Sequence, residues 1–139
     1  MRGKNIWQKW FLVLLLPVLL LLGGCATQES EEKVKDLEFT VTKESELPEA
    51  LRQQIEEKKE GTFQFTYSDN EYLYVAKGYG IQETGGYSIS VENCYLSKTA
   101  ICVKTRLQGP AVGEEVAKAP SYPYIVLKLE LREEEVLFQ

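Results

Sequence analysis

Residues 62–77 read Thr-Phe-Gln-Phe-Thr-Tyr-Ser-Asp-Asn-Glu-Tyr-Leu-Tyr-Val-Ala-Lys, and this stretch decides the fold class. Aromatic and polar residues alternate through 62–67, and a second run rich in aromatic residues follows at 72–77. A period of two is typical of β-strands. Ser68, Asp69 and Asn70 between the two runs favour a turn. The sequence therefore predicts a β-hairpin over 62–77.

Working outward, the same patterning predicts four further strands and one helix. The strands are expected at 37–42, 87–96, 101–107 and 121–131. The helix is expected at 47–60, where Pro48 suits the first turn and Gly61 the stop. Its apolar stripe consists of Leu47, Ala50, Leu51 and Ile55. We expect an α+β domain over 37–132, with the helix packed on a mainly antiparallel, curled sheet of about six strands.

The first 24 residues have the organisation of a secretory signal peptide. Arg2, Lys4 and Lys9 precede an apolar run, 11–22, that only Pro17 interrupts. As a helix this run reaches about 18 Å, against about 30 Å of hydrocarbon core, so a permanent transmembrane span is not expected. An ordinary secreted protein and a membrane-anchored one are the alternatives to the interpretation that follows.

The junction Leu22-Gly23-Gly24-Cys25 resembles the lipobox of bacterial lipoproteins. The resemblance implies a diacylglyceryl group on Cys25, cleavage before it, and an exported protein anchored at the outer face of the plasma membrane or in the outer membrane. Two acyl chains give stable membrane residence where one gives only marginal binding. The segment 26–36 contains one large apolar residue, Val34, so we expect residues 25–36 to form a lipidated, flexible tether.

Charge and residue types argue against several functions. Residues 1–24 hold three basic residues and no acid, so their removal takes the net charge from −5 to −8. An acidic chain without a basic stretch disfavours nucleic acid as a partner. The chain has no histidine, which excludes Ser-His and Cys-His nucleophiles and His-ligated zinc. Its acids lie mainly in solvated runs such as 133–135, so we expect no enzymatic activity, no metal site and no cofactor.

Cys94 and Cys102 are the remaining cysteines, and export would permit a disulfide between them. If Leu96 pairs with Ile101, however, Cys94 lies opposite Val103 and Cys102 points to the other face of the sheet. A one-residue bulge would reverse this. We favour a buried Cys94 and a half-exposed Cys102 and keep the disulfide as the alternative.

The glycine-rich run 78–87 is not a phosphate loop, because no Gly-Lys-Ser/Thr and no following helix accompany it. It is interpreted as a connection between strands in which Gly85 and Gly86 adopt positive φ.

A family resemblance begins in the same run. Gly80 with Thr84-Gly85-Gly86-Tyr87, then 110–116, then Ser121-Tyr-Pro-Tyr-Ile-Val126 resemble, in order, the C-terminal domain of PrcB. The similarity spans roughly 73–128, about half of the mature chain. Members of that family resemble small exported lipoproteins, and the founding member associates with a surface protease and supports its stability. The family supplies no catalytic residues to carry over, and this chain has no large region ahead of the matched domain.

All eight tyrosines lie in the β-rich part, and three of them flank glycine or proline turns: Tyr79, Tyr87 and Tyr122. Core packing is the ordinary role for most, but tyrosines on turns also suit a contact surface. The candidate partner-binding residues are Tyr79, Thr84, Gly85, Gly86, Tyr87 and Tyr122.

Two functions follow from the sequence. The first is a membrane-anchored, non-catalytic module that docks or stabilises an envelope protein, with an exported protease as the partner that the resemblance implies. The alternative is a lipid-tethered domain that binds a small ligand or glycan. The end of the chain, 133–139, is expected to be an acidic and apolar tail. Its Glu-Val-Leu-Phe-Gln also resembles part of a viral protease recognition tag, which leaves open whether it is native.

Overall fold

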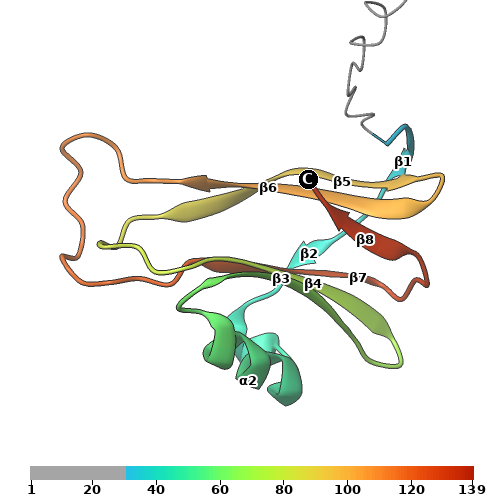
Figure 1. Ribbon diagram of the computed structural model, residues 1–139, viewed down its shortest axis with the longest axis horizontal. Coiled ribbons are helices and arrows are strands. Elements are labelled where there is room, and N and C mark those ends of the chain that lie inside the picture. The colour runs from blue at the N-terminus through green and yellow to red at the C-terminus, as the bar shows by residue number, and fades with distance from the viewer. Residues whose placement is uncertain (1–30) are drawn as a thin grey trace, which may run out of the picture. The chain divides into compact units, whose positions relative to one another are not determined.

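The computed structural model describes residues 31–139, which form one compact unit of two β-sheets and a helix (Figure 1). The predicted signal peptide, Cys25 and most of the predicted tether lie outside the described residues. The elements are β1 Lys33–Asp36, β2 Thr40–Val41, the short 3-10 helix η1 Glu44–Glu46, α2 Glu49–Lys58, β3 Thr62–Ser68, β4 Tyr72–Tyr79, β5 Ser88–Ser97, β6 Ala100–Gln108, β7 Tyr124–Glu130 and β8 Glu135–Phe138.

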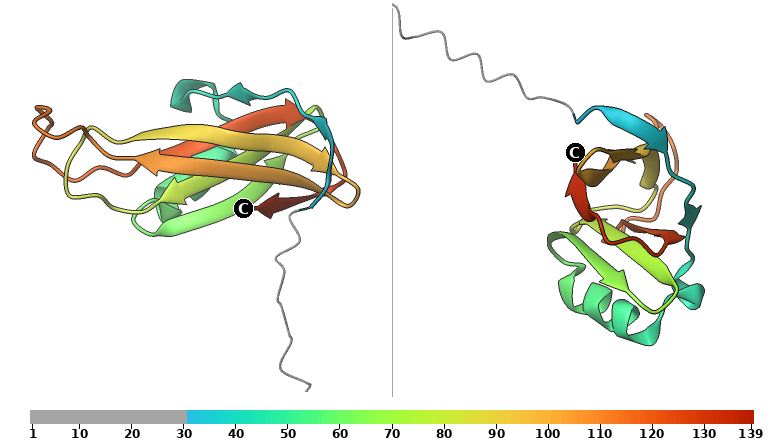
Figure 2. Two further views of the ribbon diagram at one scale, coloured as in Figure 1. Left: turned by 90° about the horizontal axis from the view of Figure 1, so that it is seen from above. Right: turned by 90° about the vertical axis from the view of Figure 1, so that its right-hand side faces the viewer.

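The predicted α+β class is confirmed, but the single sheet of about six strands is wrong. Eight strands form two four-stranded sheets with the orders β1-β5-β6-β8 and β2-β7-β4-β3. All neighbours are antiparallel except β6 and β8, which are parallel. The two sheets face each other and α2 covers the outer face of the second, as Figure 1 and the right-hand view of Figure 2 show. The sheets do not close into a barrel.

Two hydrophobic cores hold these layers together. The first lies between the sheets and is built by eight buried residues: Leu73, Val75, Cys94, Ile101, Val103, Ile125, Leu127 and Leu129. The second lies between α2 and its sheet: Leu47, Leu51, Ile55, Phe63, Tyr74, Ala76 and Val126. Strand β4 supplies both cores from alternate residues, which explains why its sequence is apolar on both faces. Both cores come wholly from the described residues, so we expect 31–139 to fold as an independent domain.

The helix is shorter than predicted at both ends, but its buried stripe is largely as expected. Leu51 and Ile55 are buried and Ala50 is exposed. Pro48 is the residue before the first turn, and its carbonyl accepts a hydrogen bond from the Arg52 amide (3.0 Å). Glu49 in the first turn and Lys58 in the last complement the helix dipole.

The β3–β4 hairpin is confirmed, and its turn is fixed by Asp69. The Asp69 carboxylate accepts the backbone N–H groups of Glu71 (2.8 Å) and Tyr72 (2.7 Å). These two hydrogen bonds hold the pKa of Asp69 below its usual value, because they stabilise the ionised form.

The β5–β6 hairpin has the expected register, with Leu96 opposite Ile101 and Cys94 opposite Val103. Cys102 therefore points to the other face, and both thiols are free. The expectation of a half-exposed Cys102 is wrong, because its side chain is fully buried. It lies between Tyr95 on β5 and Leu137 on β8, its neighbours in register.

The structure moves the boundaries of the domain outward. Residues 33–36, expected to belong to the tether, form β1 and pair with β5. The strand expected at 37–42 is reduced to β2. The expected tail contains β8, whose Val136 and Phe138 pack against the core between the sheets.

Candidate functional site

Most of the predicted site residues lie at one end of the domain, which we call the loop end. It consists of residues 80–87, between β4 and β5, and 109–123, between β6 and β7. The opposite end, here the turn end, consists of the turns at 69–71, 97–100 and 131–134. Strands β4, β5, β6 and β7 connect the two ends (Figure 1).

The two loops of the loop end are braced against each other by backbone hydrogen bonds. Gln82 and Ser121 bond reciprocally, with N–H to C=O distances of 2.8 and 3.0 Å. The Gly85 amide donates to the Ala117 carbonyl (2.9 Å), and the Ser121 hydroxyl donates to the Thr84 carbonyl (2.7 Å). Thr84 and Gly85 therefore join the loops rather than present a free recognition motif.

The predicted positive φ holds for Gly86, at 86°, but not for Gly85. A Cβ on Gly86 would lie 2.4 Å from Val116 Cγ1, so both conformation and space require glycine there. A Cβ on Gly85 would make an ordinary 3.5 Å contact with Ala117. Gly80 also has a positive φ, 74°, and turns the chain out of β4.

The three candidate tyrosines do not form one cluster. Tyr79 points between the sheets, where its hydroxyl hydrogen-bonds the Thr105 hydroxyl of β6. Tyr87 packs on Gly109, where an added Cβ would lie 3.4 Å from its ring. Tyr122 lies on the helix side instead, with Lys59 Nζ 5.1 Å from its ring centre. All three rings are half-buried, so they support the loop end more than they cover it.

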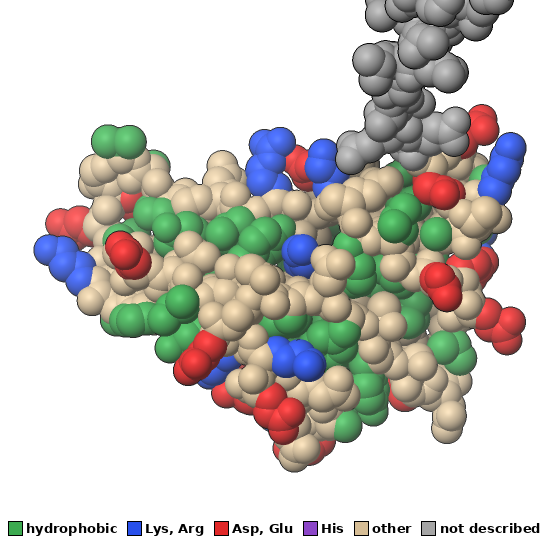
Figure 3. All heavy atoms as spheres, viewed as in Figure 1, with side chains coloured by type: hydrophobic (Ala, Val, Ile, Leu, Met, Phe, Trp, Pro, Cys, Tyr) green, Lys and Arg blue, Asp and Glu red, His purple; other side chains and the backbone are tan. Residues whose placement is uncertain are grey.

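The exposed apolar residues of the loop end were missed by the sequence analysis. Ile81 is 55% exposed, and Val112 is fully exposed at the tip of its loop, beside Gly113 with φ 81°. Figure 3 shows hydrophobic side chains on the visible face at this end. The sequence signal that could have identified them is an apolar residue next to a turn glycine, as in Gly80-Ile81 and Val112-Gly113.

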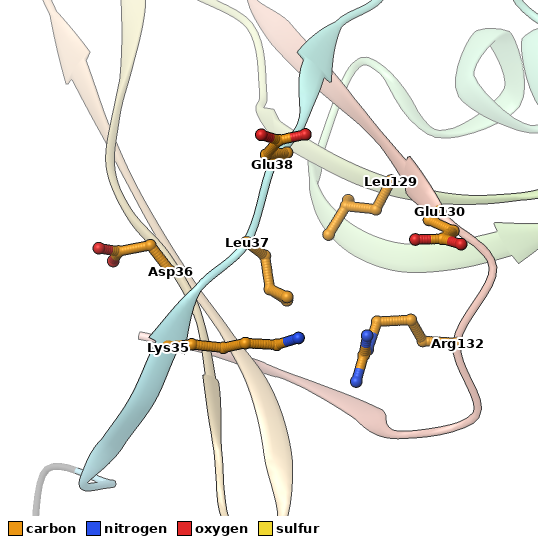
Figure 4. Close-up of a pocket in the computed structure, with 7 residues that line it drawn as sticks. All are labelled: Lys35, Asp36, Leu37, Glu38, Leu129, Glu130 and Arg132. Carbon is orange, nitrogen blue, oxygen red and sulfur yellow. The ribbon is translucent and has the colours of Figure 1, made fainter.

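A polar pocket of about 320 Å³ lies toward the turn end, between β1 and the end of β7. In Figure 4, Lys35 and Arg132 extend toward one another across it, while Asp36 points away. The Arg132 guanidinium bonds Glu134 through Nε (3.2 Å) and a terminal nitrogen (2.7 Å). This pairing lowers the pKa of Glu134, with a smaller contribution from Lys35.

Neither end shows the residues of a metal centre: within 31–139, no group of three or more Cys, Asp or Glu side chains is placed to hold an ion. The described helices are also too short or too polar to span a bilayer.

Comparison with known proteins gives one match. No curated protein and no solved structure matches the chain. The model of the family described as PrcB C-terminal matches residues 73–130. The matched segment comprises β4, β5, β6 and β7 with both loops of the loop end, and it leaves out α2, β3 and β8. Residues 73–130 of this chain therefore belong to the PrcB C-terminal family.

Proposed function

We propose that the protein is an exported, lipid-anchored, non-catalytic module that docks an envelope protein through its loop end. The observation that carries the proposal is the exposure of Ile81 and Val112 on two loops that are braced together. Loops held by a rigid scaffold are frequent binding sites. Loops that are already ordered lose less entropy on binding than free ones.

The class of partner follows from the family. The match covers the loop end and the strands that hold it, and the resemblance to PrcB implies a role in a protease complex. An exported protease, or a protein bound to one, is the partner that this relationship favours. Docking would stabilise the partner without any chemistry at the interface.

Support for the anchor comes from the lipobox-like junction at Cys25. Five residues separate Cys25 from Glu31, which lies at the turn end. There the Glu31 carbonyl accepts from the Tyr95 hydroxyl (3.0 Å) and its carboxylate from the Thr99 hydroxyl (2.9 Å). An acyl group on Cys25 would hold the turn end near the bilayer and leave the loop end accessible to a partner. Confinement to the membrane would raise the local concentration of the domain.

The test uses residues 31–139 as bait in cross-linking pull-downs from a native envelope extract. Ile81→Ser with Val112→Ser should lose the partner that the unmodified domain recovers. The matched control, Val34→Ser with Leu131→Ser, removes two exposed apolar side chains near the turn end and should retain it. Equal recovery by both double variants would remove the loop end from the proposal.

The alternative is a small-ligand domain, and the pocket between Lys35 and Arg132 is the observation that favours it. Its lining is charged and aliphatic, with Leu37 and Leu129 but no aromatic ring. The lining gives a sugar no ring on which to stack. It also holds three acids, Asp36, Glu38 and Glu130, so a small carboxylate would have to bind between Lys35 and Arg132. Saturable binding of small carboxylates, lost in Arg132→Gln, together with failure to recover any protein, would favour the alternative.

A further inference from the structure

Strand β3 is an edge strand whose sequence lacks the usual protection against pairing. Its seven residues, Thr-Phe-Gln-Phe-Thr-Tyr-Ser, contain no charge and no proline. Among the other edges of the described sheets, β1 contains three charged residues, β8 contains a glutamate and β2 is two residues long. Charges, proline and short length are the means by which edge strands avoid adding another strand.

The hydrogen-bonding pattern shows which backbone groups of β3 are unpaired. The Asp69 amide bonds the Tyr72 carbonyl (3.1 Å), so the ladder to β4 continues at every second residue: Tyr67, Phe65 and Phe63. The alternate residues direct their N–H and C=O groups away from β4: Thr62, Gln64, Thr66 and Ser68. All four of these residues are exposed, and within 31–139 no strand pairs with this side of β3.

We propose that a second copy of the chain pairs with β3 in antiparallel orientation, with the two-fold axis at Phe65. This register joins outward-facing residues to each other and uses the whole strand. Thr62 then pairs with Ser68 of the other copy, Gln64 with Thr66, and Phe63 with Tyr67. The two Phe65 side chains meet at the axis. Any other register that joins outward-facing residues of the two copies would leave part of each strand unpaired.

The strand is chemically complementary to itself in this register. On one face, hydroxyl and amide side chains oppose each other. On the other face, the aromatic side chains Phe63, Phe65 and Tyr67 form cross-strand pairs of the stabilising kind. The strand itself brings no charged residue into the pairing.

Charge outside the strand makes this association dependent on salt. Glu60 precedes β3 and Asp69 follows it, so the antiparallel register brings acids of the two copies near each other at both ends. The net charge of the chain is negative as well. Screening of these repulsions should increase the dimer fraction as ionic strength rises. The surface lies on β3, outside the loop end, so the inference does not depend on the proposed function.

Two matched variants of residues 31–139 test the register by analytical ultracentrifugation over a concentration series. Both contain Gln64→Glu, which keeps an acceptor for Lys77 Nζ, now 3.1 Å from Gln64 Oε1. When Thr66→Lys is the second change, positions 64 and 66 of the two copies would carry opposite charges. When Thr66→Glu is the second change, they would carry like charges. We expect dimer dissociation constants that differ by at least about tenfold, tighter for the Glu/Lys variant.

A second pair of variants uses the ends of the same register, Thr62→Glu with Ser68→Lys or with Ser68→Glu, in case the central changes impair folding. Equal self-association of the oppositely charged and like-charged variants would overturn the inference. So would a Glu/Lys variant that stays monomeric at the highest soluble concentration and at high salt.

Discussion

At the scale of single residues, two adjacent glycines have different requirements although they are equivalent in sequence. Gly86 has a positive φ and a Cβ position occupied by Val116, whereas Gly85 has neither constraint beyond its backbone bond to Ala117. The sequence identified both as turn residues, but only the packing of the 109–123 loop distinguishes them.

We therefore predict that Gly86→Val destabilises the domain by more than about 2 kcal/mol, because a β-branched residue resists positive φ and would overlap Val116. Gly85→Ala should stay within about 0.5 kcal/mol of the unmodified domain. Urea unfolding of 31–139 measures both changes. A similar loss in the two variants would contradict the difference in their geometry.

Burial makes Cys94 sensitive to alkaline pH. Desolvation, with a smaller effect from Asp36, raises its pKa from 9.0 to about 11. Because the folded pKa is the higher one, this contribution to stability is complete below pH 9 and is lost as pH rises from 9 to about 11. The free energy of unfolding should fall by roughly 2–3 kcal/mol over that range.

The control for this prediction is Cys94→Ala, which lowers stability through its cavity but removes the titrating thiol. Its stability should vary less between pH 9 and 11 than that of the unmodified domain. Parallel pH profiles would exclude Cys94 as the source.

For Cys94 and Cys102, the sequence predicted the direction of each side chain but not the burial of both. The opposite faces of Cys94 and Cys102 followed from strand alternation alone. The burial of Cys102 did not follow, because it depends on Leu137 of β8, a short strand that begins at the end of the acidic run 133–135.

At the scale of elements, the strands with clear alternation were predicted and the short edge strands were not. The predicted β3–β4 and β5–β6 hairpins are present, as is the helix. Strands β1 and β8 were missed because each is only four residues long: Lys-Val-Lys-Asp has one apolar residue, and Glu-Val-Leu-Phe has three in a row without alternation. Both are strands only because β5 and β6 offer edges for them to join.

Strand β8 should contribute to the free energy of unfolding, as a strand of the folded domain. Val136 and Phe138 pack against the core between the sheets, whereas Leu137 points outward and is 42% exposed. We predict that Val136→Ser with Phe138→Ser costs about 2 kcal/mol or more, while Leu137→Ser costs less than about 1 kcal/mol. Thermal melting of the purified domains compares them, and equal melting temperatures would contradict the placement of β8.

At the scale of the whole molecule, the split into a targeting segment and a domain rests on sequence alone, while the architecture of the domain required the structure. Two facing sheets could not be separated from one curled sheet by local patterns, because the order of strands is set by long-range pairing such as β6 with β8. Local patterns also could not show whether the three turn tyrosines share one surface. They do not, because Tyr122 lies on the helix side and Tyr79 lies between the sheets.

The anchor gives a prediction at this scale. Cys25→Ser should leave an unlipidated precursor that keeps residues 1–24, because the modified thiol is required before cleavage. The unmodified protein should partition with membranes and show an acylated Cys25 at its N-terminus by mass spectrometry. A mature protein that begins at any other residue would refute this prediction.

The pairing of β1 with the end of β5 has a mechanical consequence. Strand β1 joins only residues 95–97 of β5, at the turn end, and in Figure 2 it crosses that end of the domain. A pull between a membrane tether and a partner held at the loop end would reach the two sheets first through β1. The β5–β6 and β4–β7 ladders are much longer than the β1–β5 ladder. Under tension β1 would therefore detach before the long strands separate, and its release would lengthen the tether while the loop end stays folded.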